Sequence, residues 1–435
     1  MIPRRPLLLA AGALALAGIF AGLDPRVAAI WPFAALVLLA AASADAAVHA
    51  RVRAPAVERD LPRSMALGTW IDVKITVRND TARRPLRLQI FDHYPQTFAA
   101  RDLPQQTTVA PGRFQDVGYS LRATERGFFT FPGVELRIAS PLGLWWRRRF
   151  VPNAQSVRVY PNYSTISKLL AYEVDSRLQL AGMRLRQRRG EGTEFHQLRD
   201  YREGDSVRAI DWKATARTSR LIAREYQDER DQQVLFMIDA GRRMLAKDAE
   251  LSHFDHTLNA MLLLSYIALR RGDSVGVMIL GADRSWYPPR KGLQAINGLL
   301  NHVYDVQPAP HEVDYLAAAT ELAVKQRRRS LVVLLTNVRE EDTDDLVAAI
   351  GLLKRRHLVI LASLREAALD EALARRVLGF EDALLHASTA QYLEKRRGAH
   401  DLLRARGVYV DDCVWSELPA AIANRYLSIK RAGLL

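Results

Sequence analysis

The sequence contains only one cysteine, Cys413, among its 435 residues. A single thiol cannot form an intrachain disulfide, and it excludes zinc and iron–sulfur sites that need several cysteine ligands. The sequence also lacks a G-x-x-x-x-G-K-[ST] phosphate-binding loop and a G-x-S-x-G nucleophile elbow. These two absences exclude a P-loop nucleotidase and an α/β-hydrolase with a serine nucleophile.

The charge is unbalanced, because 62 Lys and Arg residues outnumber 48 Asp and Glu residues and leave a net charge of +14. Such an excess points to an acidic partner, which can be an anionic lipid, a nucleic acid or an acidic protein surface. Hydrophobic residues make up 49% and charged residues 25%, values that exclude a mainly disordered chain. The length predicts two or three domains.

Two uncharged apolar runs occupy residues 7–23 and 27–44, and only Asp24-Pro25-Arg26 separates them. At a rise of about 1.5 Å per residue, each run makes a helix of about 25–27 Å, just enough to cross a hydrocarbon core. The pattern predicts a hairpin of two transmembrane helices over residues 1–50. A cleaved signal peptide ending near Val27-Ala28-Ala29 is the alternative. Because arginines flank both outer ends, we expect the soluble domains in the cytoplasm.

Residues 51–162 have the pattern of a small β-sandwich-like domain. Apolar and polar residues alternate at 69–77, 86–90 and 134–138, and turn residues lie between these runs. Short alternating strands of this kind indicate an antiparallel sandwich. The basic and aromatic run at 145–149 (WWRRR) is interpreted as a sheet edge with solvated arginines, and a lipid-surface or binding edge is the alternative.

Residues 230–435 have the pattern of a doubly wound α/β domain. Continuous apolar runs alternate with helical patterns such as 252–270 and 314–328; the runs are 234–238, 274–280, 331–335 and 358–362. A last short strand at 408–410 lies between predicted helices over 390–406 and 416–432. Continuous apolar strands between amphipathic helices predict a parallel sheet covered on both faces. Ligands of such sheets bind beyond the carboxyl ends of the strands.

A long motif begins at residue 192 as GTEFHQLRDYREGD and continues at residue 210 as IDWKATAR. It closely resembles the signature of domain-of-unknown-function family 58, a group of bacterial membrane proteins with a von Willebrand factor A-like domain, often encoded beside MoxR-type AAA+ ATPases. The apolar N-terminus, the stretch 126–130 and the turn 140–144 fit the same resemblance, although the family commonly has an Asp-Pro-Phe-Gly type sequence at that turn. The resemblance implies a von Willebrand factor A-like fold for 230–435, a signature linker at 163–229 that packs on it, and a MoxR-type ATPase as partner at the bacterial inner membrane.

Domains of that fold often bind Mg²⁺ through an Asp-x-Ser-x-Ser motif after the first strand, a later threonine, and an aspartate after the fourth strand. Here Asp239 is present, but Gly241 and Arg243 replace the two serines. Two hydroxyl ligands are therefore missing, and a hard cation is left with too few oxygens. We expect a degenerate site with no cofactor bound, in which Arg243 pairs with Asp239; a helix cap at Asp239 is the alternative.

The late aspartate of the metal motif is replaced by Asn337, which follows Thr336, and the threonine position, near Val313-Asp314, is not evident. The loop face after these strands remains suited to contact with a protein. The candidate partner-binding residues are Asp239, Gly241, Arg243, Thr336 and Asn337.

Between residues 184 and 224, basic and acidic side chains interleave, and Tyr201 and Trp212 stand among them. The segment is either an internally paired ion lattice with these two aromatics as apolar anchors, or a recognition surface for an acidic partner. The prediction favours the lattice for Asp205, Asp211 and Trp212. The signature residues are Arg199, Tyr201, Gly204, Asp205, Arg208, Asp211, Trp212, Lys213 and Arg217.

Together these patterns predict a membrane-anchored cytoplasmic interaction or adaptor protein that is not an enzyme. No nucleic-acid partner is expected, and the sequence identifies no small-molecule substrate. Two alternatives stay open. One is a metal-dependent hydrolase or nuclease that uses Glu194, Asp205 and Asp211, since such enzymes need convergent carboxylates. The other is a Mg²⁺-dependent ligand-binding receptor domain.

Overall fold

The computed structural model describes residues 1–80, 82–162, 194–202, 207–227, 232–281 and 284–434. The chain divides into two compact units, Met1–Tyr160 and Pro161–Leu435, and each is described by itself.

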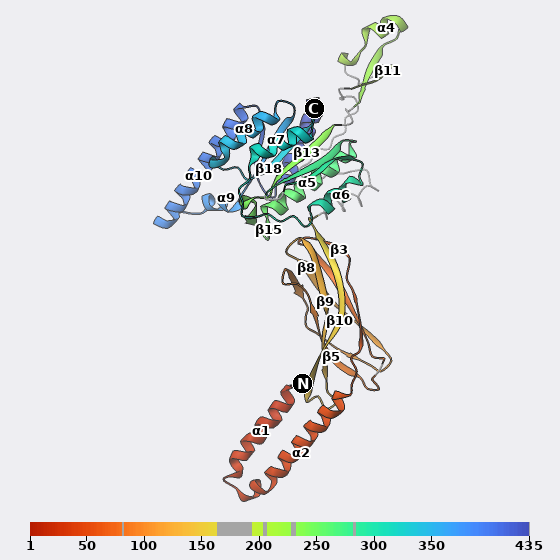
Figure 1. Ribbon diagram of the computed structural model, residues 1–435, viewed down its shortest axis with the longest axis vertical. Coiled ribbons are helices and arrows are strands. Elements are labelled where there is room, and N and C mark those ends of the chain that lie inside the picture. Colours follow the sequence, from red (N-terminus) through yellow and green to blue (C-terminus); the bar gives the residue numbers. More distant parts are fainter. Residues whose placement is uncertain (81, 163–193, 203–206, 228–231, 282–283, 435) are drawn as a thin grey trace. The chain divides into compact units, whose positions relative to one another are not determined.

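The first unit begins with two apolar helices, α1 (Arg5–Ala21) and α2 (Pro25–Ala50). They lie side by side (Figure 1), and the indole Nε1 of Trp31 donates a 2.8 Å hydrogen bond to the carbonyl of Leu14. Between them, Asp24 caps α2 by accepting a 2.9 Å hydrogen bond from the amide of Arg26. The helix α2 is long and apolar enough to cross a membrane, whereas α1 is shorter.

Both apolar runs are helical, as predicted, but α2 continues past residue 44 to Ala50. The reason lies in its last turns, because Ala42, Asp45 and His49 are buried. The polar end of α2 is thus part of the packed first unit.

The rest of the first unit consists of two sheets. One has the order β1-β10-β9-β5-β7 with β3 beside β10, and the other has the order β2-β4-β8-β6. All pairs are antiparallel except β3 with β10. The strands are β1 (Ile2–Pro3), β2 (Ala56–Asp60), β3 (Ser64–Ala66), β4 (Trp70–Arg78), β5 (Leu86–His93), β6 (Phe98–Arg101), β7 (Gln105–Val109), β8 (Phe114–Ala123), β9 (Gly127–Ala139) and β10 (Trp145–Tyr160).

The two sheets share one interior. The side chains that alternate inward, such as Ile75 and Leu136, are fully buried. A buried polar network also crosses between the sheets: Arg59 of β2 pairs with Asp92 of β5 at 2.6 Å, and Tyr119 of β8 donates a 2.5 Å hydrogen bond to the same carboxylate. This is the sandwich that the alternating pattern predicts.

The second unit begins, within the described residues, with a two-stranded antiparallel ribbon. It consists of β11 (Glu194–Asp200) and β12 (Ile222–Gln227), and the short helix α4 (Trp212–Thr218) lies in the connection between them.

The remainder of the second unit is built on a six-stranded sheet with the order β17-β16-β13-β18-β19-β20, beside a short antiparallel pair of β14 (Lys247–Asp248) and β15 (Leu251–Ser252). All neighbours are parallel except β16 with β17. The strands are β13 (Gln233–Asp239), β16 (Ser274–Leu280), β17 (Ser285–Lys291), β18 (Leu331–Thr336), β19 (Leu358–Arg365) and β20 (Tyr409–Val414). The helices are α5 (His253–Arg270), α6 (Ala295–Val303), α7 (Tyr315–Lys325), α8 (Thr343–Leu353), α9 (Ala367–Ala374), α10 (Phe380–Ala405) and α11 (Leu418–Arg431).

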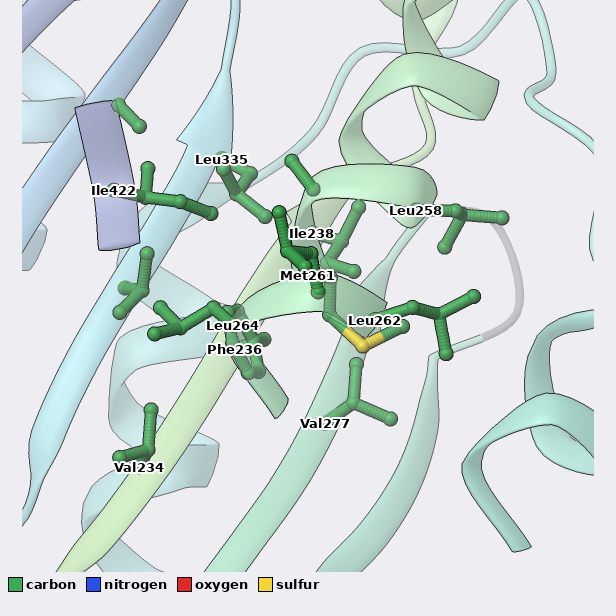
Figure 2. Packing of buried hydrophobic residues seen from close by; sticks show 14 of the residues in the cluster. Val234, Phe236, Ile238, Leu258, Met261, Leu262, Leu264, Val277, Leu335 and Ile422 are labelled. Carbon is green, nitrogen blue, oxygen red and sulfur yellow. The ribbon is translucent and has the colours of Figure 1, made fainter. Parts of the chain in front are cut away.

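Helices cover both faces of this sheet, as the apolar strands predict. On one face, α5, α6 and α11 bury a core around Phe236 and Ile238, and Figure 2 shows Met261 and Leu262 of α5 packed against these strand residues. On the other face, α7, α8 and α10 pack against Leu235 and Met237. Alternate residues of one strand therefore enter two different cores, which explains why the strand has no polar side.

Candidate functional site

The candidate site lies at the carboxyl edge of the parallel sheet, where β13 and β18 are neighbours. The chain leaves β13 toward β16 on one side of the sheet and continues from β18 to β19 on the other, so the strand order reverses between them. Open α/β sheets bind their ligands at this switch point. Asp239 is the last residue of β13, and Thr336 is the last residue of β18.

The Asp239 carboxylate is buried, with 1% of the residue exposed, and it is satisfied internally. Its Oδ1 accepts a 2.7 Å hydrogen bond from the amide of Gly241. Its Oδ2 accepts hydrogen bonds from the hydroxyl of Tyr315 at 2.7 Å and from the hydroxyl of Thr336 at 2.6 Å. The alternative of a helix cap at Asp239 is wrong, because the 3-10 turn that follows β13 has Gly241 at its N-cap and receives no side-chain cap.

The residue that sequence reasoning missed here is Tyr315, the first residue of α7. It follows the Val313-Asp314 stretch, where Asp314 caps α7 by accepting a 2.7 Å hydrogen bond from the amide of Ala317. Burial, and then the nearby Asp239 carboxylate, raise the pKa of Tyr315 well above its ordinary value. The phenol therefore keeps its proton and remains a donor to Asp239 at neutral pH.

These residues do not fit a Mg²⁺ ion. Both oxygens of Asp239 already accept hydrogen bonds from N–H and O–H donors, and Arg243 adds a positive charge beside them. A hard cation needs several free oxygen ligands in place of such donors. Within the described ranges, no group of three or more His, Cys, Asp or Glu side chains is placed to hold a metal ion.

Arg243 lies in the short 3-10 turn after β13, with 8% of its side chain exposed. Its guanidinium pairs with Asp342 and, at 3.6 Å, with Glu341, both of which come from the turn before α8. The predicted pair between Arg243 and Asp239 is therefore wrong. Asp239 accepts its hydrogen bonds from hydroxyl and amide groups, and the guanidinium of Arg243 pairs instead with the carboxylates of the turn before α8.

Asn337 faces away from Asp239, although it directly follows Thr336. Its Nδ2 donates to Glu366 at 2.8 Å, and its Oδ1 accepts a 2.6 Å hydrogen bond from Arg396. Successive residues along an extended chain point in opposite directions, so Thr336 and Asn337 cannot both reach one site. The expectation that Asn337 occupies the late aspartate position beside Asp239 is wrong.

Arg396 of α10 is a second residue that the sequence did not reveal, and it is 1% exposed. Its guanidinium also donates to the carbonyl of Val338 and to the hydroxyl of Ser363, and it pairs with Asp412 at 3.0 Å. One cation thus fills the carboxyl edge beyond β18, β19 and β20. Nothing in the basic run around Arg396 distinguishes it from its neighbours, and only the fold selects it.

The free space at the switch point is small. A cavity of about 20 Å³ is lined by Asp239, Gly241, Arg242, Arg243, His311, Glu312, Val313, Tyr315 and Asp342. That volume holds about one water molecule. A metabolite would need a pocket of several hundred Å³.

The signature motif maps to the ribbon. Arg199 lies in β11 and Tyr201 directly follows it, while Trp212, Lys213 and Arg217 lie on α4. Asp211 caps α4 by accepting a 3.0 Å hydrogen bond from the amide of Ala214, and it pairs with Arg224 at 2.9 Å. These contacts, first the hydrogen bond from the Ala214 amide, lower the pKa of Asp211. Other predicted members lie outside the described residues: Gly204 and Asp205 entirely, and Glu194 and Arg208 in their side chains.

Trp212 is 64% exposed, so its predicted role as a buried apolar anchor is wrong. It is the first residue of α4, a seven-residue helix with no buried residues, which has too little surface to cover an indole ring. Other apolar side chains of the same segment are also exposed, namely Leu198, Val207 and Leu221. An exposed aromatic with apolar and arginine neighbours is typical of a protein contact surface.

Residues 197–384 match the family described as Protein of unknown function DUF58. This match covers less than half of the chain. The match begins in β11 and runs through the switch point into the start of α10. It therefore includes both the ribbon and Asp239, the two features that the sequence motif and the fold single out.

Curated relatives match parts of the chain. Uncharacterized protein YeaD of Bacillus subtilis (strain 168) is 26% identical over 268 residues, which are 60% of this chain and 62% of that protein. Uncharacterized protein Rv1480 of Mycobacterium tuberculosis (strain ATCC 25618 / H37Rv) is 27% identical over 151 residues, 34% of this chain and 48% of that protein. The chain thus spans less than two thirds of the length of these relatives.

Two solved structures resemble short parts of the chain. An aerotolerance-related membrane protein from Bacteroides fragilis NCTC 9343 has 18% identity and a TM-score of 0.24, covering 30% of this chain and 67% of that one. A Salmonella alpha-2-macroglobulin mutant has 21% identity and a TM-score of 0.20, covering 25% of this chain and 7% of that one. Likeness at these TM-scores carries no argument about fold or function.

Proposed function

We propose that this chain is a membrane-anchored interaction protein that acts by binding a protein partner and performs no catalysis. The N-terminal helices hold it at the bacterial inner membrane with its other domains in the cytoplasm. The α/β domain is von Willebrand factor A-like, a proposal that the strand order β17-β16-β13-β18-β19-β20 supports. By the family resemblance, the partner is a MoxR-type AAA+ ATPase, and the role is that of an adaptor in protein assembly or maturation.

One observation carries the proposal: the polar groups at the switch point are engaged with one another and leave room for about one water molecule. Asp239 is held by Tyr315, Thr336 and Gly241, and the cavity measures about 20 Å³. A crevice of this kind supports surface contact better than substrate turnover. The carboxylate Asp211, on which the hydrolase alternative depends, serves as a helix cap and ion-pair partner.

The contact surface that we assign to the α/β domain is the rim of this crevice. Arg242 and Glu312 lie there, are exposed, and pair with each other at 2.9 Å. Leu245 is 41% exposed in the same turn as Arg242. The exposed Trp212 gives the DUF58 region a second contact point on the ribbon. Charged rim residues steer association, while aromatic residues supply most of the binding energy of such contacts.

The experiment is photocrosslinking of the full chain in native membranes. A photoreactive amino acid replaces Glu312 at the carboxyl edge of the sheet. The matched control replaces Arg355, an exposed residue in the turn before β19, at the amino edge. We expect Glu312 to capture an AAA+ ATPase that mass spectrometry identifies, and Arg355 to capture none. Equal capture at both edges, or no AAA+ ATPase in either product, would contradict the proposal.

A further inference from the structure

Within the first unit, both N-terminal helices meet the sandwich at the start of β10, and we call this region the anchor end. The helix α1 begins at Arg5, one residue after β1, which pairs with Trp145 and Trp146 of β10. The helix α2 ends at Ala50, and Arg147 of β10 donates hydrogen bonds to the carbonyls of His49 at 2.8 Å and Ala50 at 2.6 Å. One strand therefore holds the outer ends of both helices.

The contacts at the anchor end show which residues of α2 lie beside the sandwich. The indole Nε1 of Trp145 donates a 2.9 Å hydrogen bond to the carbonyl of Ala42, and the amide of Leu142 donates a 3.0 Å hydrogen bond to the carboxylate of Asp45. The last two turns of α2 thus run beside the sandwich. Residues 25–41 remain as the part of α2 that can enter a bilayer, a length of about 25 Å.

The helix α1 has 17 residues, so its length is also about 25 Å. Both lengths are shorter than a typical hydrocarbon core of about 30 Å. A bilayer accommodates short spans by thinning and by drawing flanking residues into the headgroup layer. The start of β10 is the flanking structure here, so it is drawn to the level of the lipid headgroups.

The side chains at this level suit an interface. Trp145 and Trp146 are half-buried, and Leu142 is 64% exposed at the turn before them. The guanidinium of Arg4 lies over the Trp146 ring, 4.3 Å from its centroid, and donates to the carbonyl of Gly143 at 3.3 Å. Tryptophan prefers the membrane–water boundary because its ring is apolar and its N–H is polar.

Four further arginines near the anchor end are exposed. Arg5 adjoins the stacked Arg4, Arg51 and Arg53 follow the end of α2, and Arg149 lies on the same face of β10 as Arg147 because strand residues alternate. In the part of the chain that the structure describes, no ion pair involves these four side chains. By contrast, Arg148, on the opposite face, pairs with Glu135 at 2.6 Å.

We infer that the anchor end of the sandwich binds the anionic phosphate headgroups of the bilayer that the helices enter, through Arg5, Arg51, Arg53 and Arg149. This rests on the proposed membrane anchor and adds a second, peripheral contact to it. Arginine suits the role because its planar guanidinium donates two hydrogen bonds to a phosphate. The contact adds a second attachment of the sandwich to the membrane surface.

The sandwich offers a matched control at its other end. Arg63 and Arg158 are exposed, and the amide of Arg158 donates to the carbonyl of Arg63 at 3.0 Å. Arg158 is close to the far end of β10, about 40 Å along the strand from Trp145. That distance exceeds several Debye lengths, so these two arginines do not sense the headgroup charge.

The test uses the full chain in nanodiscs that contain equal amounts of phosphatidylglycerol and phosphatidylcholine. Native mass spectrometry then gives the ratio of the two lipids that stay bound to the released protein. Each arginine near an anionic surface is worth about a fivefold change in binding. We therefore expect the phosphatidylglycerol preference to fall about 25-fold in R51Q/R149Q. It should fall less in R51K/R149K, because lysine keeps the charge but not the paired hydrogen bonds, and it should remain unchanged in R63Q/R158Q.

Alkaline carbonate extraction of membranes, run in parallel, separates this inference from the proposed anchor. If the unsubstituted chain stays in the membrane but R51Q/R149Q keeps its lipid preference, the headgroup site is wrong and the anchor stands. If the unsubstituted chain is extracted, the anchor fails, and the headgroup site fails with it. Excess inorganic phosphate that abolishes the preference would show a site for free phosphate, which also contradicts a lipid site.

Discussion

Removing one hydroxyl at the switch point tests whether Asp239 is held as described. The substitution Tyr315→Phe keeps the aromatic ring in its buried place and deletes only the group that donates to Oδ2 at 2.7 Å. A hydrogen bond to a buried charged acceptor is worth about 2 kcal/mol, and no cavity adds to that cost. For a domain of this size, we expect the unfolding midpoint to fall by about 4–8 °C.

The single cysteine provides an assay that reports on the α/β domain alone within the full chain. Cys413 lies in β20 with 4% of the residue exposed, and burial raises the pKa of its thiol to about 12. A thiol reagent therefore labels it only after the sheet opens. Pulsed labelling of detergent-solubilised protein along a temperature or urea series gives the midpoint.

The matched control is Tyr409→Phe. Tyr409 is half-buried on β20, and the structure gives its hydroxyl no hydrogen bond among the described residues. We expect this variant to change the free energy of unfolding by no more than about 0.5 kcal/mol. Equal midpoints for Tyr315→Phe and Tyr409→Phe would refute the argument, because the hydroxyl of Tyr315 would then contribute nothing to the buried carboxylate.

Two other predictions use the same labelling assay. Replacing Arg396 by Met leaves Asp412 and Asn337 without their buried partner and should lower the free energy of unfolding by about 3 kcal/mol. The matched control Arg397→Met changes an exposed residue and should leave the free energy of unfolding almost unchanged. Equal losses in the two variants would contradict a central role for Arg396. Burial lowers the pKa of His400 from 6.5 to about 4. As the pH falls below about 6.5, this histidine therefore binds a proton in the unfolded chain but stays neutral in the folded chain. Stability should fall by about 2 kcal/mol more between pH 7 and pH 5 in the unsubstituted chain than in His400→Gln, and parallel pH profiles would exclude this contribution.

Much of the architecture could be predicted from local patterns. The uncharged N-terminal runs, the alternating segments and the wholly apolar strands each show their periodicity within a few residues. For example, Val234–Ile238 has no polar side because both faces of β13 are covered. The chain itself also marks turns and caps, as with Asp24 before α2.

The partners at the candidate site could not be predicted in this way. The Asp239 carboxylate meets hydroxyls that lie 76 and 97 residues further along the chain, and Asn337 meets a guanidinium 59 residues away. Spacing in the sequence gives no measure of such distances, so Arg243 was assigned to the wrong carboxylate and Tyr315 was missed. The motif around Trp212 is visible in the sequence, but the exposure of the Trp212 side chain depends on the size of α4, which is too short to cover the ring.

The sequence by itself therefore determined the elements, because hydrophobic periodicity and caps act between residues a few positions apart. The tertiary structure alone decided which polar groups satisfy one another at the carboxyl edge of the sheet and where the end of α2 rests on the sandwich. Burial makes an unpaired polar group costly, and the fold alone determines which donors are close enough to pair with it.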